Sequence, residues 1–163
     1  MNSITQKTWH FDHWPFLAWV ETVIKFSAFL VALVTIIRLL PGLPLSAPVG
    51  KTATLSIIQG ILSMGLIAAI FDRLKEKEII AMGFVVFNNL AHWSALILLF
   101  SKQPPISALQ IFWLLLLIGD LVKILFLYAH NFTVRNTPRA AMFGLTGFYI
   151  LGYGLLLIIS VII

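Results

Sequence analysis

Two long apolar segments joined by a Pro-Pro loop decide the fold of this chain. They lie between Ile79 and Tyr128, in the stretch IIAMGFVVFNNLAHWSALILLFSKQPPISALQIFWLLLLIGDLVKILFLY. At about 1.5 Å per residue, each segment is long enough as a helix to cross the roughly 30 Å hydrocarbon layer of a bilayer. The stretch therefore predicts two transmembrane helices connected by residues 102–105.

The composition of the whole chain is also that of a membrane protein. Its 163 residues are 60% hydrophobic and only 10% charged, and the mean hydropathy is +1.01, values far from those of soluble domains. The chain has no cysteine, which excludes disulfides and thiolate metal sites. The net charge of +5 does not indicate nucleic-acid binding, because Lys and Arg stand singly at the ends of apolar runs, where topology signals occur.

We predict an all-α integral membrane protein, a single bundle of five transmembrane helices with a short interfacial N-terminal segment. The predicted spans are residues 16–40, 52–71, 79–100, 106–128 and 140–163. Residues 72–78 are interpreted as a mixed-charge turn in water. Residues 1–15 are expected to lie against the headgroup layer, and His10 and His13 there lack the further ligands of a metal site. A four-helix protein, whose first segment lies flat or re-enters the membrane, is the alternative.

The distribution of positive charge predicts the orientation. With five spans, one side of the membrane receives Lys7, Arg73, Lys75, Lys77, Arg135 and Arg139, and the other receives Arg38, Lys51 and Lys102. Because Lys and Arg accumulate on the cytoplasmic side, we expect a cytoplasmic N-terminus and an external C-terminus, in a bacterial-type cytoplasmic membrane.

Polar side chains near the middle of the spans are the candidate functional residues. They are Asn88, Asn89, His92, Asp120, Lys123, Gln59, Tyr149 and Tyr153. A lone ionised side chain at the bilayer centre costs about 3 kcal/mol or more, so these groups are expected to face protein. Because spans joined by a short loop are normally antiparallel neighbours, Asn88, His92 and Asp120 are expected to meet. Asp120 is expected to be the only acidic residue deep in the membrane.

The predicted cluster has one structural and several functional interpretations. In the structural one, Asp120 pairs with Lys123, and Asn88 and His92 form hydrogen bonds between helices. The functional ones are a lipid-like ligand site with acid–base chemistry from Asp120 and His92, a proton or ion path, and a haem held by His92 alone. Glu21 and Lys25 are interpreted separately, as an ion pair near one membrane face from which the lysine reaches the headgroups.

The expected function is non-enzymatic. No nucleotide-binding glycine loop, HExxH or GxSxG motif occurs, and no cofactor is assigned. We expect a small polytopic protein acting as a subunit, or as a lipid- or hydrophobic-ligand-binding module, of a larger membrane assembly. Its partners would be membrane lipids and a protein partner or a second copy. Small residues that favour close helix packing support this interpretation; they are Ser56, Gly60 and Ser63 in one span and Ala140, Gly144, Gly147 and Gly154 in another. The alternatives are a membrane-embedded enzyme acting on a lipid-like substrate through Asp120 and His92, and a component of an ion or proton pathway.

Overall fold

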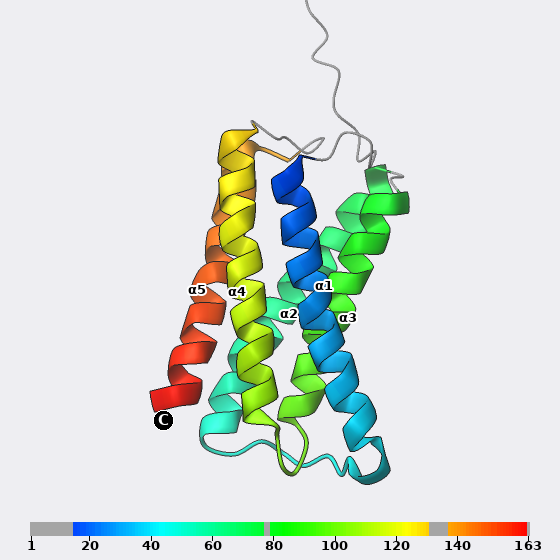
Figure 1. Cartoon of the computed structure of the whole chain (residues 1–163). Coiled ribbons are helices and arrows are strands. Elements are labelled where there is room, and N and C mark those ends of the chain that lie inside the picture. The colour runs from blue at the N-terminus through cyan, green and yellow to red at the C-terminus, as the bar shows by residue number, and fades with distance from the viewer. Residues whose placement is uncertain (1–14, 77–78, 131–136, 163) are drawn as a thin grey trace, which may run out of the picture.

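The computed structural model describes residues 15–76, 79–130 and 137–162 of the chain. Over these residues the regular secondary structure is helical, and an isolated bridge pairs Leu45 with Ser101 between two loops. The elements are α1 (Phe16–Leu39), the 3-10 turn η2 (Leu40–Gly42), α2 (Lys51–Glu76), α3 (Ile79–Leu99), α4 (Ile106–Ala129) and α5 (Arg139–Ile162) (Figure 1). Each of the five long helices contains a segment long and apolar enough to cross a membrane, as predicted.

Prolines mark several of the helix ends, which explains why the predicted spans agree with the structure. Pro15 and Pro105 directly precede α1 and α4, and Pro138 precedes α5. Proline lacks a backbone N–H and disfavours helix in the residue before it, so it is well suited to the first turn of a helix and poorly suited to its interior. Pro41, in η2, stands just beyond the end of α1.

The largest difference from the prediction is at the end of α2. This helix continues to Glu76, so the interpretation of residues 72–78 as a turn was wrong for its first five residues. Hydropathy marks where a chain leaves the membrane, and it does not mark where a helix ends. Lys, Glu and Arg are good helix formers, so a helix can continue beyond the apolar layer into water.

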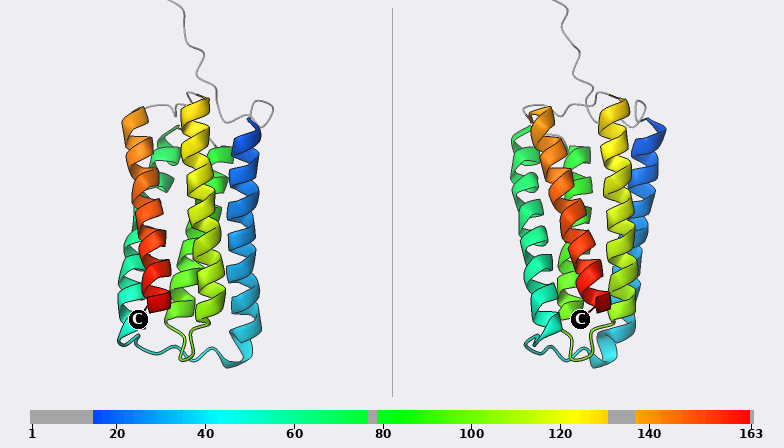
Figure 2. Two further views of the ribbon diagram at one scale, coloured as in Figure 1. Left: turned by 60° about the vertical axis from the view of Figure 1, so that its left-hand side comes forward. Right: turned by 90° about the vertical axis from the view of Figure 1, so that its left-hand side faces the viewer.

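The five helices form a ring in the order α1, α4, α5, α2, α3, and each packs against two neighbours (Figure 1, Figure 2). The expectation that α3 and α4 are neighbours along their length was therefore wrong, because these two helices make few contacts. Their connecting loop is held instead by the loop that follows η2. Ser46 donates its N–H to the oxygen of Phe100 at 2.8 Å, and Lys102 donates to the oxygen of Pro44 at 3.0 Å.

The interior and the outer surface of the ring differ as a membrane protein requires. Side chains that fill the interior include Trp113, Leu62, Leu116 and Leu156, all of them fully buried. The outer surface carries many large apolar side chains; Leu151, for example, is 75% exposed. Such a surface is suited to lipid, whereas polar groups in the same layer must find partners inside the protein.

Candidate functional site

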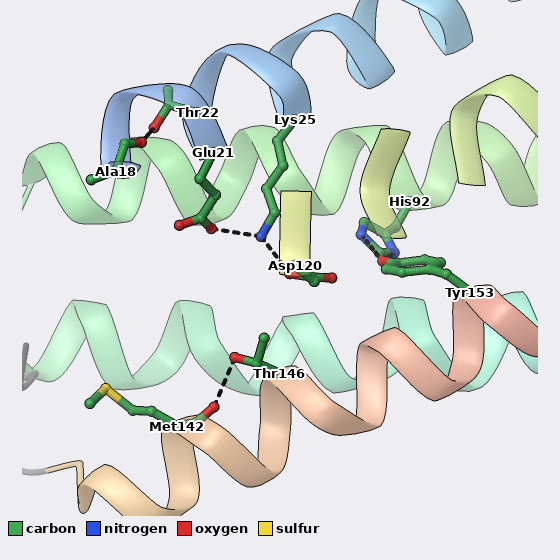
Figure 3. A network of polar contacts seen from close by, with 9 residues as sticks. All are labelled: Ala18, Glu21, Thr22, Lys25, His92, Asp120, Met142, Thr146 and Tyr153. Carbon is green, nitrogen blue, oxygen red and sulfur yellow. Dashed lines mark hydrogen bonds and ion pairs between the residues drawn. The ribbon is translucent and has the colours of Figure 1, made fainter. Parts of the chain in front are cut away.

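An ion triad joins α1 to α4 inside the bundle. The Nζ atom of Lys25 lies 2.8 Å from Oε1 of Glu21 and 2.8 Å from Oδ1 of Asp120 (Figure 3). The three side chains retain only 15% (Glu21), 13% (Lys25) and 6% (Asp120) of their exposure. The triad is thus a charged group held almost entirely within protein.

Helix geometry explains how the triad forms. Glu21 and Lys25 stand four residues apart, so they lie on one face of α1 with the glutamate N-terminal, the favourable order. Asp120 lies nine residues before the end of α4 at Ala129, about 14 Å below that end. The start of α1 is at the same end of the bundle, at the top of Figure 1. The two helices therefore bring opposite charges to similar depth.

A histidine–tyrosine pair crosses the interior at a second level. The hydroxyl of Tyr153 in α5 lies 2.7 Å from Nε2 of His92 in α3 (Figure 3). The rings of Phe112 and Tyr149 also lie beside the imidazole, with centroids 6.3 and 5.9 Å from it. Because α3 and α5 are not neighbours in the ring, this contact lies within the bundle and is enclosed by the other helices.

A third polar level lies further from the triad. Trp113 donates its indole N–H to Oε1 of Gln59 at 2.9 Å, and Nε2 of Gln59 donates to the backbone oxygen of His92 at 3.2 Å. Trp113 and Asp120 are seven residues apart on α4, which separates these two levels by about 10 Å along the helix. Gln59 thus connects α4 to α3 through α2.

Two further predicted residues bind backbone oxygens of α2. Tyr149 donates its hydroxyl to Leu62 at 3.0 Å. Asn89 donates its amide N–H groups to Leu66 at 3.1 Å and to Val85 of its own helix at 2.9 Å. Its Oδ1 atom is buried and has no hydrogen-bond partner among the described residues.

The predicted cluster is therefore divided. Buried positions are occupied by Gln59, Asn89, His92, Asp120, Tyr149 and Tyr153, whereas Asn88 and Lys123 are half-buried. Asp120 is bound by Lys25, a partner that the sequence did not connect to it, and His92 is bound by Tyr153. The described hydrogen bonds and ion pairs do not join Asn88, His92 and Asp120 to one another.

Two sequence interpretations need correction at the triad. The Glu21–Lys25 pair forms as predicted, but Lys25 turns into the bundle, toward Asp120, and does not extend to the headgroups. Asp120 is also not the only acidic group at this site, because Glu21 shares the same ammonium. Depth in the bundle is the sequence feature that could have linked Lys25 to Asp120, because both residues lie about 14 Å from the same end of the bundle.

The site offers carboxylate, ammonium, imidazole and phenol groups, which are the usual materials of proton transfer and of acid–base chemistry. Among the residues that the structure describes, no group of three His, Asp or Glu is placed to hold a metal ion. His10 and His13, with the rest of the expected interfacial segment up to residue 14, lie outside the described residues. Comparison of the chain with protein-family models, with curated proteins and with solved structures finds no significant match.

Proposed function

We propose that this chain is a component of a proton pathway, with the Glu21–Lys25–Asp120 triad as its internal proton-binding site. The observation that carries the proposal is the composition of the triad, in which two carboxylates share one ammonium inside an apolar bundle. With all three groups ionised, the triad carries one net negative charge. A net charge held away from water is costly, and one bound proton removes it.

The arrangement of the other polar groups supports a route from this site through the bundle. Along the helices from the end of the bundle where α1 begins, Tyr149 lies at about 15 Å, close to the level of the triad, Tyr153 at about 21 Å and Trp113 at about 24 Å. Buried leucines, among them Leu62, Leu116 and Leu156, pack in the same core as Trp113, Tyr149 and Tyr153. We therefore propose transfer of protons between side chains, and not an open pore for hydrated ions.

A liposome assay tests the proposal. The purified protein is reconstituted with a pH-sensitive dye inside, and a potassium diffusion potential drives proton entry. Wild type should acidify the interior, and Asp120→Asn and Glu21→Gln should reduce the rate at least tenfold. Glu76→Gln, which makes the same chemical change at the end of α2, is the matched control. A wild-type rate equal to that of empty liposomes, or full activity in Asp120→Asn, would refute the proposal.

A second candidate role, as a subunit or lipid-binding module of a larger assembly, is favoured by one outward face of α5. A Cβ atom added at Gly144, Gly147 or Gly154 would meet no atom within 4 Å. Small residues of this kind allow another helix to approach closely. Native mass spectrometry of the gently extracted protein should then show a partner chain, a second copy or a retained lipid. A bare monomer, unchanged in Gly144→Leu, would argue against this role.

The enzyme alternative receives less support from the geometry. Asp120 is held by Lys25, and the His92 ring is held by Tyr153, so the two side chains proposed to share acid–base work have different partners. General acid–base catalysis requires both groups within hydrogen-bond reach of one substrate.

We also propose that the N-terminus lies in the cytoplasm of a bacterial-type cell and the C-terminus outside. The reason is that Lys and Arg accumulate in the segments expected at the end of the bundle where α1 begins. The chain has no cysteine, so single cysteines report the orientation directly. Gln103→Cys should react with a membrane-impermeant maleimide in intact cells, and Thr137→Cys should react only after permeabilisation. The reverse pattern would invert the proposed orientation.

A further inference from the structure

Gly119 lies where the Lys25 side chain crosses α4. A Cβ atom built at Gly119 would stand 3.1 Å from Cγ and 3.3 Å from Cε of Lys25, and 3.6 Å from Cγ2 of Ile24. Carbon atoms in favourable contact are about 3.5–4.0 Å apart, so the first two distances are too short. The lysine stem therefore lies directly against the bare backbone of α4.

This close approach sets the position of the ammonium. Both ends of the Lys25 side chain are fixed: the backbone end by α1 and the Nζ atom by its 2.8 Å contacts with Glu21 and Asp120. A stem held at both ends has little freedom to move aside. Ala28 and Ala32 follow at i+3 and i+7 on the same face of α1, and both are buried, so the approach continues along the helix.

We infer that Gly119 is a positioning residue for the triad, and that its missing side chain is what allows Lys25 to sit between the two carboxylates. The inference rests on the proposed function for its consequence in proton movement. Gly119 acts through the placement of Lys25.

The test combines proton flux with the coupling between Lys25 and Asp120. Gly119→Ala and Gly119→Val are compared with Gly83→Val, because a Cβ atom at Gly83 on α3 would meet no atom within 4 Å. In the liposome assay, Gly119→Ala should slow proton entry about threefold and Gly119→Val at least tenfold, and Gly83→Val should match wild type. Thermal unfolding midpoints are then measured in detergent with and without Asp120→Asn.

In the wild-type and Gly83→Val backgrounds, Asp120→Asn should lower the midpoint clearly. In the Gly119→Val background, Asp120→Asn should lower the unfolding midpoint far less, because Lys25 is already displaced. The effects of substitutions that disrupt the same contact are not additive. Gly119→Ala provides a milder version if the valine variant does not fold. An undiminished effect of Asp120→Asn in both Gly119 variants would overturn the inference. Another outcome is that the wild type moves no protons while Asp120→Asn still has a diminished effect in the Gly119 variants. That combination would support the positioning role of Gly119 and refute only the proposed function.

Discussion

Lys25 is a cation enclosed within the helix bundle and held by two carboxylates. It donates to Glu21 in its own helix and to Asp120, which is 95 residues away in the sequence. Among the described side-chain hydrogen bonds and ion pairs, the contact with Asp120 is the one that joins α1 to another helix. Its loss would therefore affect both the charge balance of the interior and the attachment of α1.

Removal of the ammonium should be the most destabilising change at the triad. Lys25→Met leaves two carboxylates without their shared cation, and breaking a buried ion pair in this way costs about 3–5 kcal/mol. Titration of folded protein with SDS in mixed micelles measures the loss. The triple variant Glu21→Gln, Lys25→Met, Asp120→Asn should recover part of it, because no unpaired charge remains.

Lys102→Met, at an exposed loop position, is the control and should leave the unfolding free energy unchanged. Equal stability of Lys25→Met and wild type would show that the triad contributes nothing to folding.

The His92–Tyr153 contact should be worth much less than the triad. Tyr153→Phe removes only the hydroxyl, and hydrogen bonds between transmembrane helices average about 0.6 kcal/mol, with a maximum of about 1.7 kcal/mol. We expect a loss of unfolding free energy in that range, with no further loss when His92→Phe is added. Tyr128→Phe, at a side chain that is 77% exposed, is the matched control. A loss above about 3 kcal/mol would require another role for the hydroxyl.

At the scale of helices, the glycines of α5 separate its two faces. A Cβ atom at Gly152 would lie 2.6 Å from Cδ2 and 2.9 Å from Cδ1 of Leu62, so α5 meets α2 closely at this point. On α2, a Cβ atom at Gly65 would lie 2.8 Å from the Tyr149 hydroxyl. The open positions at Gly144, Gly147 and Gly154 face away from such contacts.

Alanine substitutions should distinguish the two faces. Gly152→Ala forces the buried Leu62 side chain to move and should cost about 1–3 kcal/mol of unfolding free energy, as overpacking does. Gly144→Ala meets open space and should be neutral or stabilising by up to about 1 kcal/mol, since alanine favours helix over glycine. The same SDS titration measures both variants. Equal effects would mean that α5 does not pack on α2 through Gly152.

At the scale of the whole molecule, the order of the helices around the ring differs from their order in the sequence. α2 and α5 are neighbours although two helices separate them in the sequence, and α3 and α4 make few contacts although a short loop joins them. Polar contacts cross the enclosed space, as Trp113 does to Gln59 and Tyr153 does to His92. The ring thereby places polar groups of several helices along a shared interior.

Cysteine cross-linking in this cysteine-free chain tests the ring. Leu62→Cys with Gly152→Cys should form a disulfide on mild oxidation, because the two positions are in direct contact. Ser94→Cys with Leu114→Cys, on α3 and α4, should remain reduced. Electrophoresis after proteolytic cleavage between the cysteines detects the link. Cross-linking of the second pair and not the first would favour a simple sequential bundle over the ring.

Much of the architecture was predictable because helix formation in a membrane is a local property. Apolar runs of sufficient length located all five helices, and prolines located several of their ends. The end of α2 was missed because charged helix formers carry a helix beyond the apolar layer. Burial of Gln59, His92 and Asp120 also followed from the sequence, since lipid offers such groups no hydrogen-bond partner.

The sequence by itself determined that this chain forms five membrane-length helices and which polar groups must turn away from lipid. Only the tertiary structure decided their partners. Lys25 binds Asp120 because α1 packs against α4, and His92 binds Tyr153 because α3 faces α5 across the ring. The physical reason is that hydropathy is a property of one segment, whereas helix order depends on how small and large side chains of distant segments fit together. Gly119 against the Lys25 stem is one such fit, and a single sequence does not reveal it.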